Sequence, residues 1–493
     1  MFRVLPVWLA RDGRAQGPFP LRIGLNDWYL FTQQDTRLHP RLLEILAAHA
    51  AERPEIEVFY ADEVIVDSSA GYSEQQICKS CFDRTQIIAQ DYIGWPILVR
   101  GNALKKLGGP DPAAGTALTY DLILRALSEG IGIERIPEVF AVHDRTPSAV
   151  ADRAAALERW RQRSAPGHNV LGGMVESTFQ LQRSFLNSPS VTLVVPTQQR
   201  RRVIGAASRA SEPMIIDFLE SLCRTRWPMD RLCVLVGDDV VNGRPYETRH
   251  WPFQLERTIT TRSEGEGFNY AAKMNHLWPR AASEYVVFMN DDLVVQSPDW
   301  LLALMTFAVN EEIGGVGARL LYPDNTIQHV GMPAGVFGAP MHIFRHRPAS
   351  LRSYQNWAEV HREWSMVTGA VFATRKSVLR RANGFDEQFS LDFTDVDLCL
   401  RLRLLGYRIV YTPFAELVHF ESASRAGMYP PARDIALFME RWRDLLRDDP
   451  AYHPRLTRQS HDTVPTRIGN EWWAAPASTA EITGTAMLQD ALG

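Results

Sequence analysis

The stretch that decides the fold is YVVFMNDD at residues 285–292, where five apolar or aromatic residues are followed by two adjacent carboxylates. A short apolar run bounded by polar residues is typical of a buried strand. Charge at the end of a buried strand is unfavourable unless it is compensated, and a divalent cation is the usual compensating group. We therefore predict a metal site at Asp291 and Asp292.

Two further apolar runs predict neighbouring strands, at residues 191–196 (VTLVVP) and 232–237 (LCVLVG), with a helical pattern at 215–222 between them. Strand, helix, strand indicates an open α/β sheet, in which ligands bind beyond the carboxyl ends of the strands. Asp238 and Asp239 follow the second strand, so we expect them to contact a base or a ribose. A solvated turn is the alternative interpretation.

A helix is predicted over residues 268–275, after a flexible loop at 263–267, with Asn269 as its N-cap. Lys273 and Asn275 on this helix are candidates to reach a diphosphate, because backbone N–H groups at a helix start favour anions. An ordinary capped helix would explain the same residues.

Composition limits the classes of function. The chain has 493 residues, 45% of them hydrophobic and 22% charged, which is ordinary for a protein with one or more large cores. The net charge of −4 argues against bulk nucleic-acid binding, which needs a basic excess. No apolar run approaches a membrane span, and the first residues break too early for a secretory signal, so we expect a cytoplasmic protein, with peripheral contact to the inner face of a membrane left open.

The cysteines point the same way. There are five, an odd number that fits a reducing compartment. Cys78 and Cys81 form a single CxxC without a second pair at zinc-ligand spacing, which favours two inert thiols over structural zinc.

In the tail, Trp472 and Trp473 are expected to dock on their own protein rather than on a membrane or a partner.

An internal repeat is visible. Residues 120–125 (YDLILR) with the later Gly130, Pro137 and His143 recur, 276 positions on, as residues 396–401 (VDLCLR) with Gly406, Pro413 and His419. Residues 28–35 likewise resemble 285–292. The two copies are unequal: only 30 residues precede Phe31, Gln34 replaces the first acid of the pair, and Thr119 stands where the second copy has Asp395.

The second copy resembles a family-2 glycosyltransferase of GT-A fold, of the bacterial polysaccharide or rhamnosyltransferase-like kind. The resemblance covers about residues 191–460 and rests on an ordered set of motifs, each weak alone: VVPT at 194–197, FNYAAKMN at 268–275, FMNDD at 288–292, GARLLYPD at 317–324, TGA at 368–370, GFDE at 384–387, DVDLCLR at 395–401 and HFESASR at 419–425.

This resemblance implies the organisation of the chain. We expect an α/β protein with a catalytic GT-A domain, a Rossmann-like mixed sheet, at residues 189–460. Residues 1–150 would be a truncated, non-catalytic GT-A-like domain, 151–188 a linker helix and loop, and 461–493 a loosely ordered tail.

The resemblance also implies roles for individual residues. Asp395 matches the general base, and Asp397 is an alternative base or a helper, although N-terminal capping of its helix would also explain it. Metal ligands for Mg²⁺ or Mn²⁺ would be Asp291, Asp292 and His419. The implied set that binds the nucleotide-diphosphate sugar donor comprises Pro196, Thr197, Asp238, Asp239, Asn269, Lys273 and Asp291.

The implied reaction is metal-dependent transfer, with inversion, of a hexosyl or rhamnosyl group to a saccharide or lipid-linked acceptor in cell-surface polysaccharide synthesis. The alternative is an inactive GT-A scaffold or a carbohydrate-binding protein. A processive synthase is disfavoured because Phe438 replaces the glutamine of a QxxRW motif before Arg441-Trp442. The basic cluster at residues 341–346 is either an anion-binding site for the acceptor or, more simply, a solvated loop.

Overall fold

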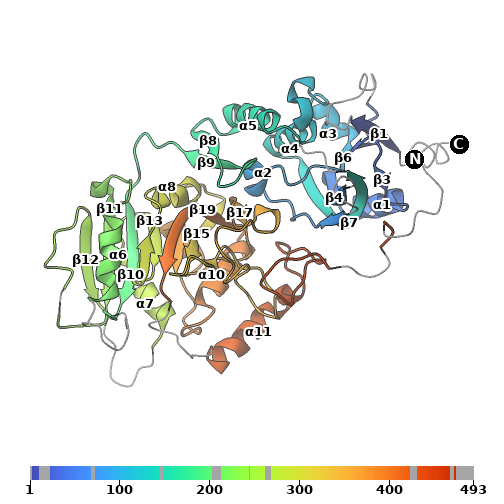
Figure 1. The fold of residues 1–493 in the computed structure, drawn as a ribbon. Coiled ribbons are helices and arrows are strands. Elements are labelled where there is room, and N and C mark those ends of the chain that lie inside the picture. Colours follow the sequence, from blue (N-terminus) through green and yellow to red (C-terminus); the bar gives the residue numbers. More distant parts are fainter. Residues whose placement is uncertain are drawn as a thin grey trace.

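Two mixed sheets, each with helices packed on it, make up the protein (Figure 1). The structure is a computed structural model and describes residues 3–9, 23–67, 73–144, 148–201, 212–243, 245–260, 268–421, 430–466 and 471–473. The predicted loop at 263–267 lies outside these residues. Among the described helices, none combines the length and the apolar character that a membrane crossing needs.

The larger sheet is built from the strands that the apolar runs predict. Its strand order is β12-β11-β10-β13-β18-β15-β19-β14, with β16 paired to β15 and β17 to β19. The bounds are β10 Val191–Thr197, β11 Leu232–Asp238, β12 Gln254–Ile259, β13 Tyr285–Met289, β14 Leu293–Val295, β15 Ile313–Leu321, β16 Ile327–His329, β17 Arg362–Glu363, β18 Val371–Arg375 and β19 Arg408–His419.

Helices cover both faces of this sheet, because successive strand residues point to opposite faces. Val286 and Phe288 of β13 lie in one hydrophobic cluster with α7, α9, α10 and α11, whereas Val287 and Met289 lie in another with α6 and α8. The helices are α6 Met214–Leu222, α7 Tyr270–Leu277, α8 Trp300–Ala308, α9 Lys376–Arg381, α10 Thr394–Leu404 and α11 Ala432–Arg447. The helix predicted over 215–222 is confirmed.

The first sheet lies in residues 4–144 and has the order β1-β2-β6-β4-β7-β3, with β5 paired to β4. Its strands are β1 Val4–Leu9, β2 Trp28–Gln33, β3 Arg37–Leu38, β4 Ile56–Asp67, β5 Ser73–Ile77, β6 Ile97–Arg100 and β7 Gly132–Asp144. Its helices are α1 Leu42–Glu52, α2 Gln86–Ala89, α3 Gly101–Lys106 and α4 Leu118–Ser128.

The two sheets share one topology over six strands. Reading β1-β2-β6-β4-β7-β3 against β10-β13-β18-β15-β19-β14, each neighbouring pair is parallel or antiparallel in the same sense. The strands β11 and β12, at one end of the second sheet, have no counterpart among the described strands of the first. The described part of the first sheet therefore lacks the strand β11, which carries Asp238 in the second sheet.

The connection between the sheets is more ordered than the predicted helix and loop. It contains α5 (Val150–Ser164) and then a hairpin of β8 (His168–Gly172) and β9 (Phe179–Arg183). Short 3₁₀ segments occur at Pro112–Ala117, Met229–Arg231, Trp278–Arg280 and Tyr354–Asn356.

Residues 474–493 lie outside the described residues, but the two tryptophans just before them are placed. Trp473 is buried with Val139 and Val142 of the first sheet, and the Trp472 indole N–H donates to the Val139 carbonyl at 3.0 Å. The prediction that this pair docks on its own protein is confirmed.

Residues 330–366, which we call the wall segment, run between β16 and β18 with little regular structure. One flank contacts the first sheet: the Tyr354 hydroxyl accepts from the Cys78 amide at 2.9 Å, and the Glu363 amide donates to Asp83 at 2.7 Å. The other flank contacts residues 449–461, where the Ala334 amide donates to Asp449 at 2.6 Å.

Candidate functional site

Three parallel strands deliver the first polar groups of the site to one edge of the larger sheet. β10, β11 and β13 are parallel neighbours, so Thr197, Asp238 and the residues after Met289 meet at their carboxyl ends. The Thr197 hydroxyl donates to Asp291 Oδ2 at 2.5 Å. The edge is therefore acidic, as predicted from 285–292.

Burial disfavours the ionised form of Asp291 unless a cation compensates its charge. Burial and then the adjacent Asp292 raise the pKa of Asp291 to about 6, although the Thr197 hydrogen bond and Lys273 act against that rise. A divalent cation favours the ionised form of a carboxylate that it contacts. The residues present thus fit a metal ion.

His419 reaches the same edge from β19. Antiparallel pairing with β14 places His419 opposite Leu293, the residue directly after the acids. His419 Nε2 lies 3.0 Å from Asp292 Oδ1, and both side chains are buried. Of the three predicted metal ligands, the structure thus places Asp292 and His419 in contact, whereas Asp291, the preceding residue, accepts from Thr197.

Asp395 comes from the first turn of α10. Its Oδ2 accepts from the Gly369 amide at 2.6 Å and its Oδ1 from the Val396 amide at 2.9 Å. A cavity of about 240 Å³ is lined by Asp395 together with Asp292 and His419. The predicted base and the predicted metal ligands therefore share one pocket.

Asp397, the alternative base, does not line that pocket. It is fully buried, and its oxygens pair with Arg401 at 2.7 Å, with Arg441 at 3.3 Å and with the Trp442 indole at 3.1 Å. Asp397 is two residues from Asp395, and side chains so spaced on a helix point to different faces. The geometry gives Asp397 a role in holding α10 against α11.

The part of the chain that forms the first sheet, residues 4–144, is called the first unit below. It repeats nearly all the hydrogen bonds and ion pairs found around Asp397. Asp121 pairs with Arg125 at 2.7 Å, and Arg125 also donates to the Leu107 and Gly109 carbonyls. Arg401 likewise donates to the Ala382 and Gly384 carbonyls. Because the same bonds occur in a unit with Thr119 in the base position, they are structural in both.

Asp238, the last residue of β11, and Asp239, the next residue, differ in what they can still bind. Asp238 is fully buried and accepts from Tyr246, Arg257 and Gln199, and from the Val240 amide. These partners use its acceptor capacity, so the expected nucleotide contact of Asp238 is not supported. Asp239 accepts from Lys273 Nζ and from Thr260, each at 2.7 Å, and remains partly exposed.

The helix α7 begins as predicted, since Asn269 Oδ1 caps it by accepting from the Ala272 amide at 2.8 Å. Lys273 also contacts the Thr197 carbonyl at 3.4 Å, and burial lowers its pKa despite Asp239. Asn275 points elsewhere: it bonds the Phe385 amide and carbonyl and so holds the turn at Gly384. The expectation that Asn275 reaches a diphosphate is therefore wrong.

Other pocket residues escaped prediction from the sequence. They include Gln328 from β16, Met332, Pro340, His342 and Arg345 from the wall segment, and Glu421, which lies just after β19. The only signal was the basic cluster at 341–346, but it is not a cationic patch. Arg345 lies 3.3 Å from Glu421, and burial lowers the pKa of His342 to about 4. Residues 422–429, which follow Glu421, are outside the described residues.

His342 is held in one tautomer. The Thr368 amide donates to His329 Nε2 at 3.4 Å, so His329 carries its proton on Nδ1 and donates to His342 Nδ1 at 3.0 Å. A neutral His342 then has its N–H at Nε2. The pocket therefore has an uncharged donor where the sequence suggested a cation.

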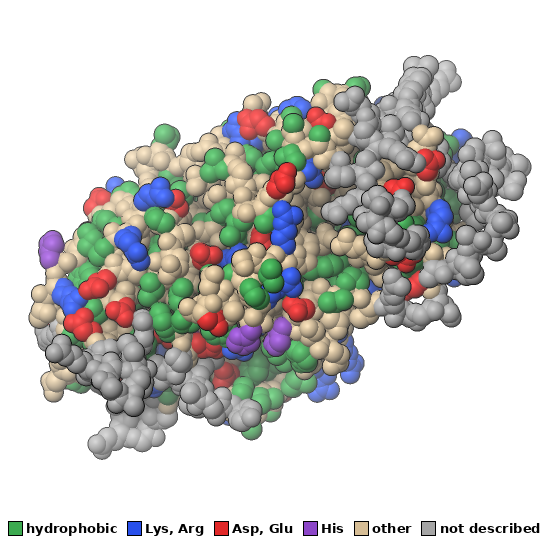
Figure 2. Space-filling model, in the orientation of Figure 1, with side chains coloured by type: hydrophobic (Ala, Val, Ile, Leu, Met, Phe, Trp, Pro, Cys, Tyr) green, Lys and Arg blue, Asp and Glu red, His purple; other side chains and the backbone are tan. Residues whose placement is uncertain are grey.

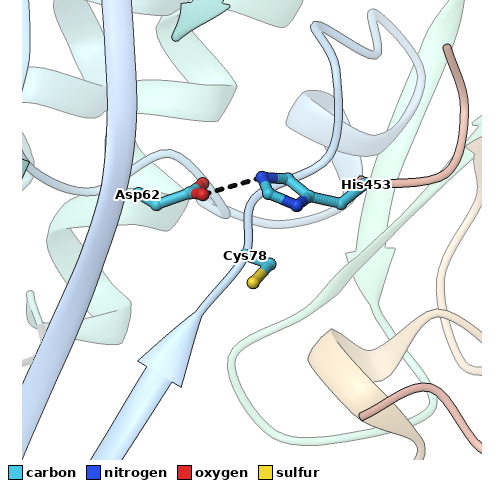
Figure 3. Close-up of side chains that lie close together, drawn as sticks. All are labelled: Asp62, Cys78 and His453. Atoms are coloured by element: carbon cyan, nitrogen blue, oxygen red, sulfur yellow. Dashed lines mark ion pairs between the residues drawn. The ribbon is translucent and has the colours of Figure 1, made fainter. Parts of the chain in front are cut away.

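A second cluster of metal-ligating types lies at the contact of the first sheet with the C-terminal segment (Figure 3). Ligand atoms of Asp62, Cys78 and His453 all lie within 4.8 Å of one another, and the three residues are buried. However, the Arg455 amide donates to His453 Nδ1 at 3.0 Å, which leaves the proton on Nε2, 2.7 Å from Asp62. This favours an Asp–His pair over a metal centre, and Cys81 is not part of the cluster.

On the face drawn in Figure 2, Lys and Arg side chains are interspersed with Asp and Glu rather than gathered in one patch.

Residues 189–432 match the family described as "Glycosyltransferase like family 2". The chain is 29% identical over 452 residues to the O-antigen biosynthesis protein RfbC of Myxococcus xanthus, covering 89% of this chain and 34% of that protein. It is 24% identical over 293 residues to an N-acetylglucosaminyl-diphospho-decaprenol L-rhamnosyltransferase of Mycobacterium tuberculosis, covering 55% of this chain and 86% of that one.

The chain spans about a third to a half of the length of the first two curated relatives that it matches. Among solved structures, it is similar to the mannosyltransferase PcManGT of Pyrobaculum calidifontis in complex with GDP-Man and Mn²⁺. The identity is 18%, the coverage is 54% of this chain and 72% of that one, and the TM-score is 0.34.

Proposed function

Because residues 189–432 belong to glycosyltransferase family 2, we propose that the chain transfers a glycosyl group, with inversion, from a nucleotide-diphosphate sugar to a saccharide or lipid-linked acceptor in cell-surface polysaccharide synthesis. The observation that carries this proposal is the single pocket that holds Asp395 with Asp292 and His419. Single displacement needs a base that takes the proton of the acceptor hydroxyl. It also needs ligands for the metal ion that binds the donor's diphosphate.

Asp395 is the proposed general base. Its carboxylate accepts the proton of an acceptor hydroxyl as that oxygen attacks the anomeric carbon and the bond to the diphosphate breaks. The amides of Gly369 and Val396 fix the carboxylate in place. A positioned base typically contributes about 10²–10⁴-fold to such a rate.

Asp292 and His419, with Asp291, are the proposed ligands of a Mg²⁺ or Mn²⁺ ion. Carboxylate oxygens suit such ions, and substrate phosphate oxygens would add further oxygen ligands. When bound, the ion stabilises the negative charge on the leaving nucleoside diphosphate.

The donor-binding set is revised by the geometry. Thr197, Asp239 and Lys273 form one connected group next to Asp291, and we propose that Lys273 meets the diphosphate and Asp239 the nucleoside. Asp238 is left out of this group, because Tyr246 and Arg257 donate to its carboxylate. Asn269 contributes as the cap of α7, and Pro196 as part of β10.

We also propose that the first unit is a truncated, non-catalytic relative of the second. The shared order of six strands supports this, as does the absence of counterparts to β11 and β12 among its described strands. In that unit His143 pairs with Glu63 at 2.8 Å, and Lys79 Nζ lies 3.5 Å from the same carboxylate. The Lys79 ammonium group compensates the Glu63 carboxylate, so this carboxylate does not require a metal ion.

A donor panel tests the proposal. Purified full-length protein is mixed with UDP-, GDP- and dTDP-sugars in the presence of Mn²⁺, Mg²⁺ or EDTA, and release of nucleoside diphosphate is followed together with thermal shift. We expect one nucleotide class to stabilise the protein and to be hydrolysed slowly in a metal-dependent way, with Asp395→Asn binding normally but inactive. Failure of every donor to bind would favour the scaffold alternative.

A further inference from the structure

Gln328 on β16 contacts His419, and we expect it to act on the site through that histidine rather than by binding a substrate. Its Oε1 lies 2.6 Å from His419 Nδ1, and both residues are buried. Its Nε2 donates to the His419 carbonyl at 3.4 Å and to Glu421 Oε2 at 3.2 Å. Because both of those partners are acceptors, the orientation of the amide is determined, with the oxygen facing the imidazole.

That orientation decides where His419 carries its proton. An amide oxygen only accepts, so His419 Nδ1 must be the donor, and the lone pair of the neutral ring lies on Nε2. Nε2 is also the atom that lies 3.0 Å from Asp292 Oδ1 and 3.2 Å from Asn290 Nδ2. A lone pair facing a carboxylate oxygen at this distance is unfavourable unless a proton or a cation is shared between them.

We propose that Gln328 is a positioning residue for the metal site: it fixes His419 in the tautomer and ring orientation that let Nε2 bind the ion beside Asp292. This inference rests on the proposed function. Metal-ligating histidines commonly donate their second ring N–H to an acceptor that fixes the ring, and loss of that acceptor typically lowers metal affinity about 10–100-fold.

The placement of Gln328 also separates its role from that of its neighbour. β16 pairs with β15, and the next residue, His329, contacts His342 instead of His419. Ile327, on the other side, is fully buried in the hydrophobic cluster. Changes at 327 therefore test general damage to the strand, whereas changes at 328 test the bond to His419.

The test measures Mn²⁺ binding to the full-length protein by electron paramagnetic resonance, with the metal alone and with UDP, GDP or dTDP added. We expect Gln328→Leu to weaken Mn²⁺ binding about 10–100-fold and to shift the ¹⁵N signals of His419 away from the Nδ1–H tautomer. Ile327→Val, the matched control, should bind as the wild type does. A Gln328→Glu/Glu421→Gln variant keeps an acceptor for Nδ1–H without adding charge, and it should restore most of the affinity.

The outcomes separate the two proposals. If the wild type binds no Mn²⁺ with any of these nucleotides, the metal dependence in the proposed function fails. If the wild type binds and Gln328→Leu binds equally well with an unchanged His419 tautomer, the positioning role is refuted. Equal losses in Ile327→Val and Gln328→Leu would also refute it, because the effect would then belong to the strand.

Discussion

Replacing Asp397 by Asn distinguishes a structural from a catalytic carboxylate in α10. The side chain keeps its shape but loses its charge, within a cluster that contains Arg401, Arg441 and the Trp442 indole. Breaking a buried ion pair costs about 3–5 kcal/mol. Arg401 retains two carbonyl acceptors, at Ala382 and Gly384, so the lower end, about 3 kcal/mol, is expected.

Urea unfolding and thermal melting measure this loss. For a unit of about 150–250 residues, about 3 kcal/mol corresponds to a fall in Tm of about 6–12 °C. Below the melting range, the donor turnover of Asp397→Asn should stay within a few-fold of the wild type. Asp395→Asn should show the opposite pattern, with nearly unchanged stability and turnover lowered about 10²–10⁴-fold.

Asp121→Asn in the first unit is the matched control. Asp121 is as deeply buried as Asp397, and its arginine partner makes the equivalent bonds. We expect a comparable loss of stability and no change in turnover. The structural assignment is refuted if Asp397→Asn melts like the wild type yet loses turnover as Asp395→Asn does.

Three other substitutions give further checks. Lys273→Met should weaken nucleoside diphosphate binding at least tenfold by calorimetry, because it removes the cation beside Asp239 and Asp291; unchanged affinity would remove Lys273 from the donor site. Burial and then Glu363 raise the pKa of Asp83 to about 7. The protonated acid is thus favoured in the folded state, and stability falls as pH rises from about 4 to about 7. Asp83→Asn should therefore stabilise the protein at about pH 8 more than at about pH 5 in urea unfolding, and an equal effect at both would contradict this. His453→Phe removes the hydrogen-bond donor to the buried Asp62 and should cost about 1–3 kcal/mol, whereas added Zn²⁺ should leave the wild-type Tm unchanged; a Zn²⁺-dependent rise would reinstate a metal centre there.

The strands of the larger sheet were predictable because burial on both faces leaves nearly continuous apolar runs, as at 191–196 and 285–289. The strand-end acids and the cap at Asn269 were predictable for local reasons, since their signals lie within a few residues. The different directions of Asp395 and Asp397 also follow from helical spacing alone, although the sequence interpretation kept both as candidate bases.

What escaped prediction depends on contacts between distant segments. Nothing near Asp238 shows that Tyr246 and Arg257 use its oxygens, and nothing near Asn275 shows that it binds the turn at 384–385. Gln328 and His342 lie in stretches where no periodic pattern of apolar residues predicts a helix or a strand. Their places in the pocket arise from a short strand and an irregular segment that other parts of the chain hold in position.

The position of the wall segment has a consequence for how specificity can change. This segment supplies Met332, Pro340, His342 and Arg345 to the pocket, yet its outer flank rests on the first unit through Tyr354 and Glu363. A substitution at Asp83 can therefore alter acceptor choice without touching a substrate, and its effect will depend on which residues the wall carries. Epistasis between the two units is the expected result, because substitutions in the first unit can reach the pocket through the wall segment.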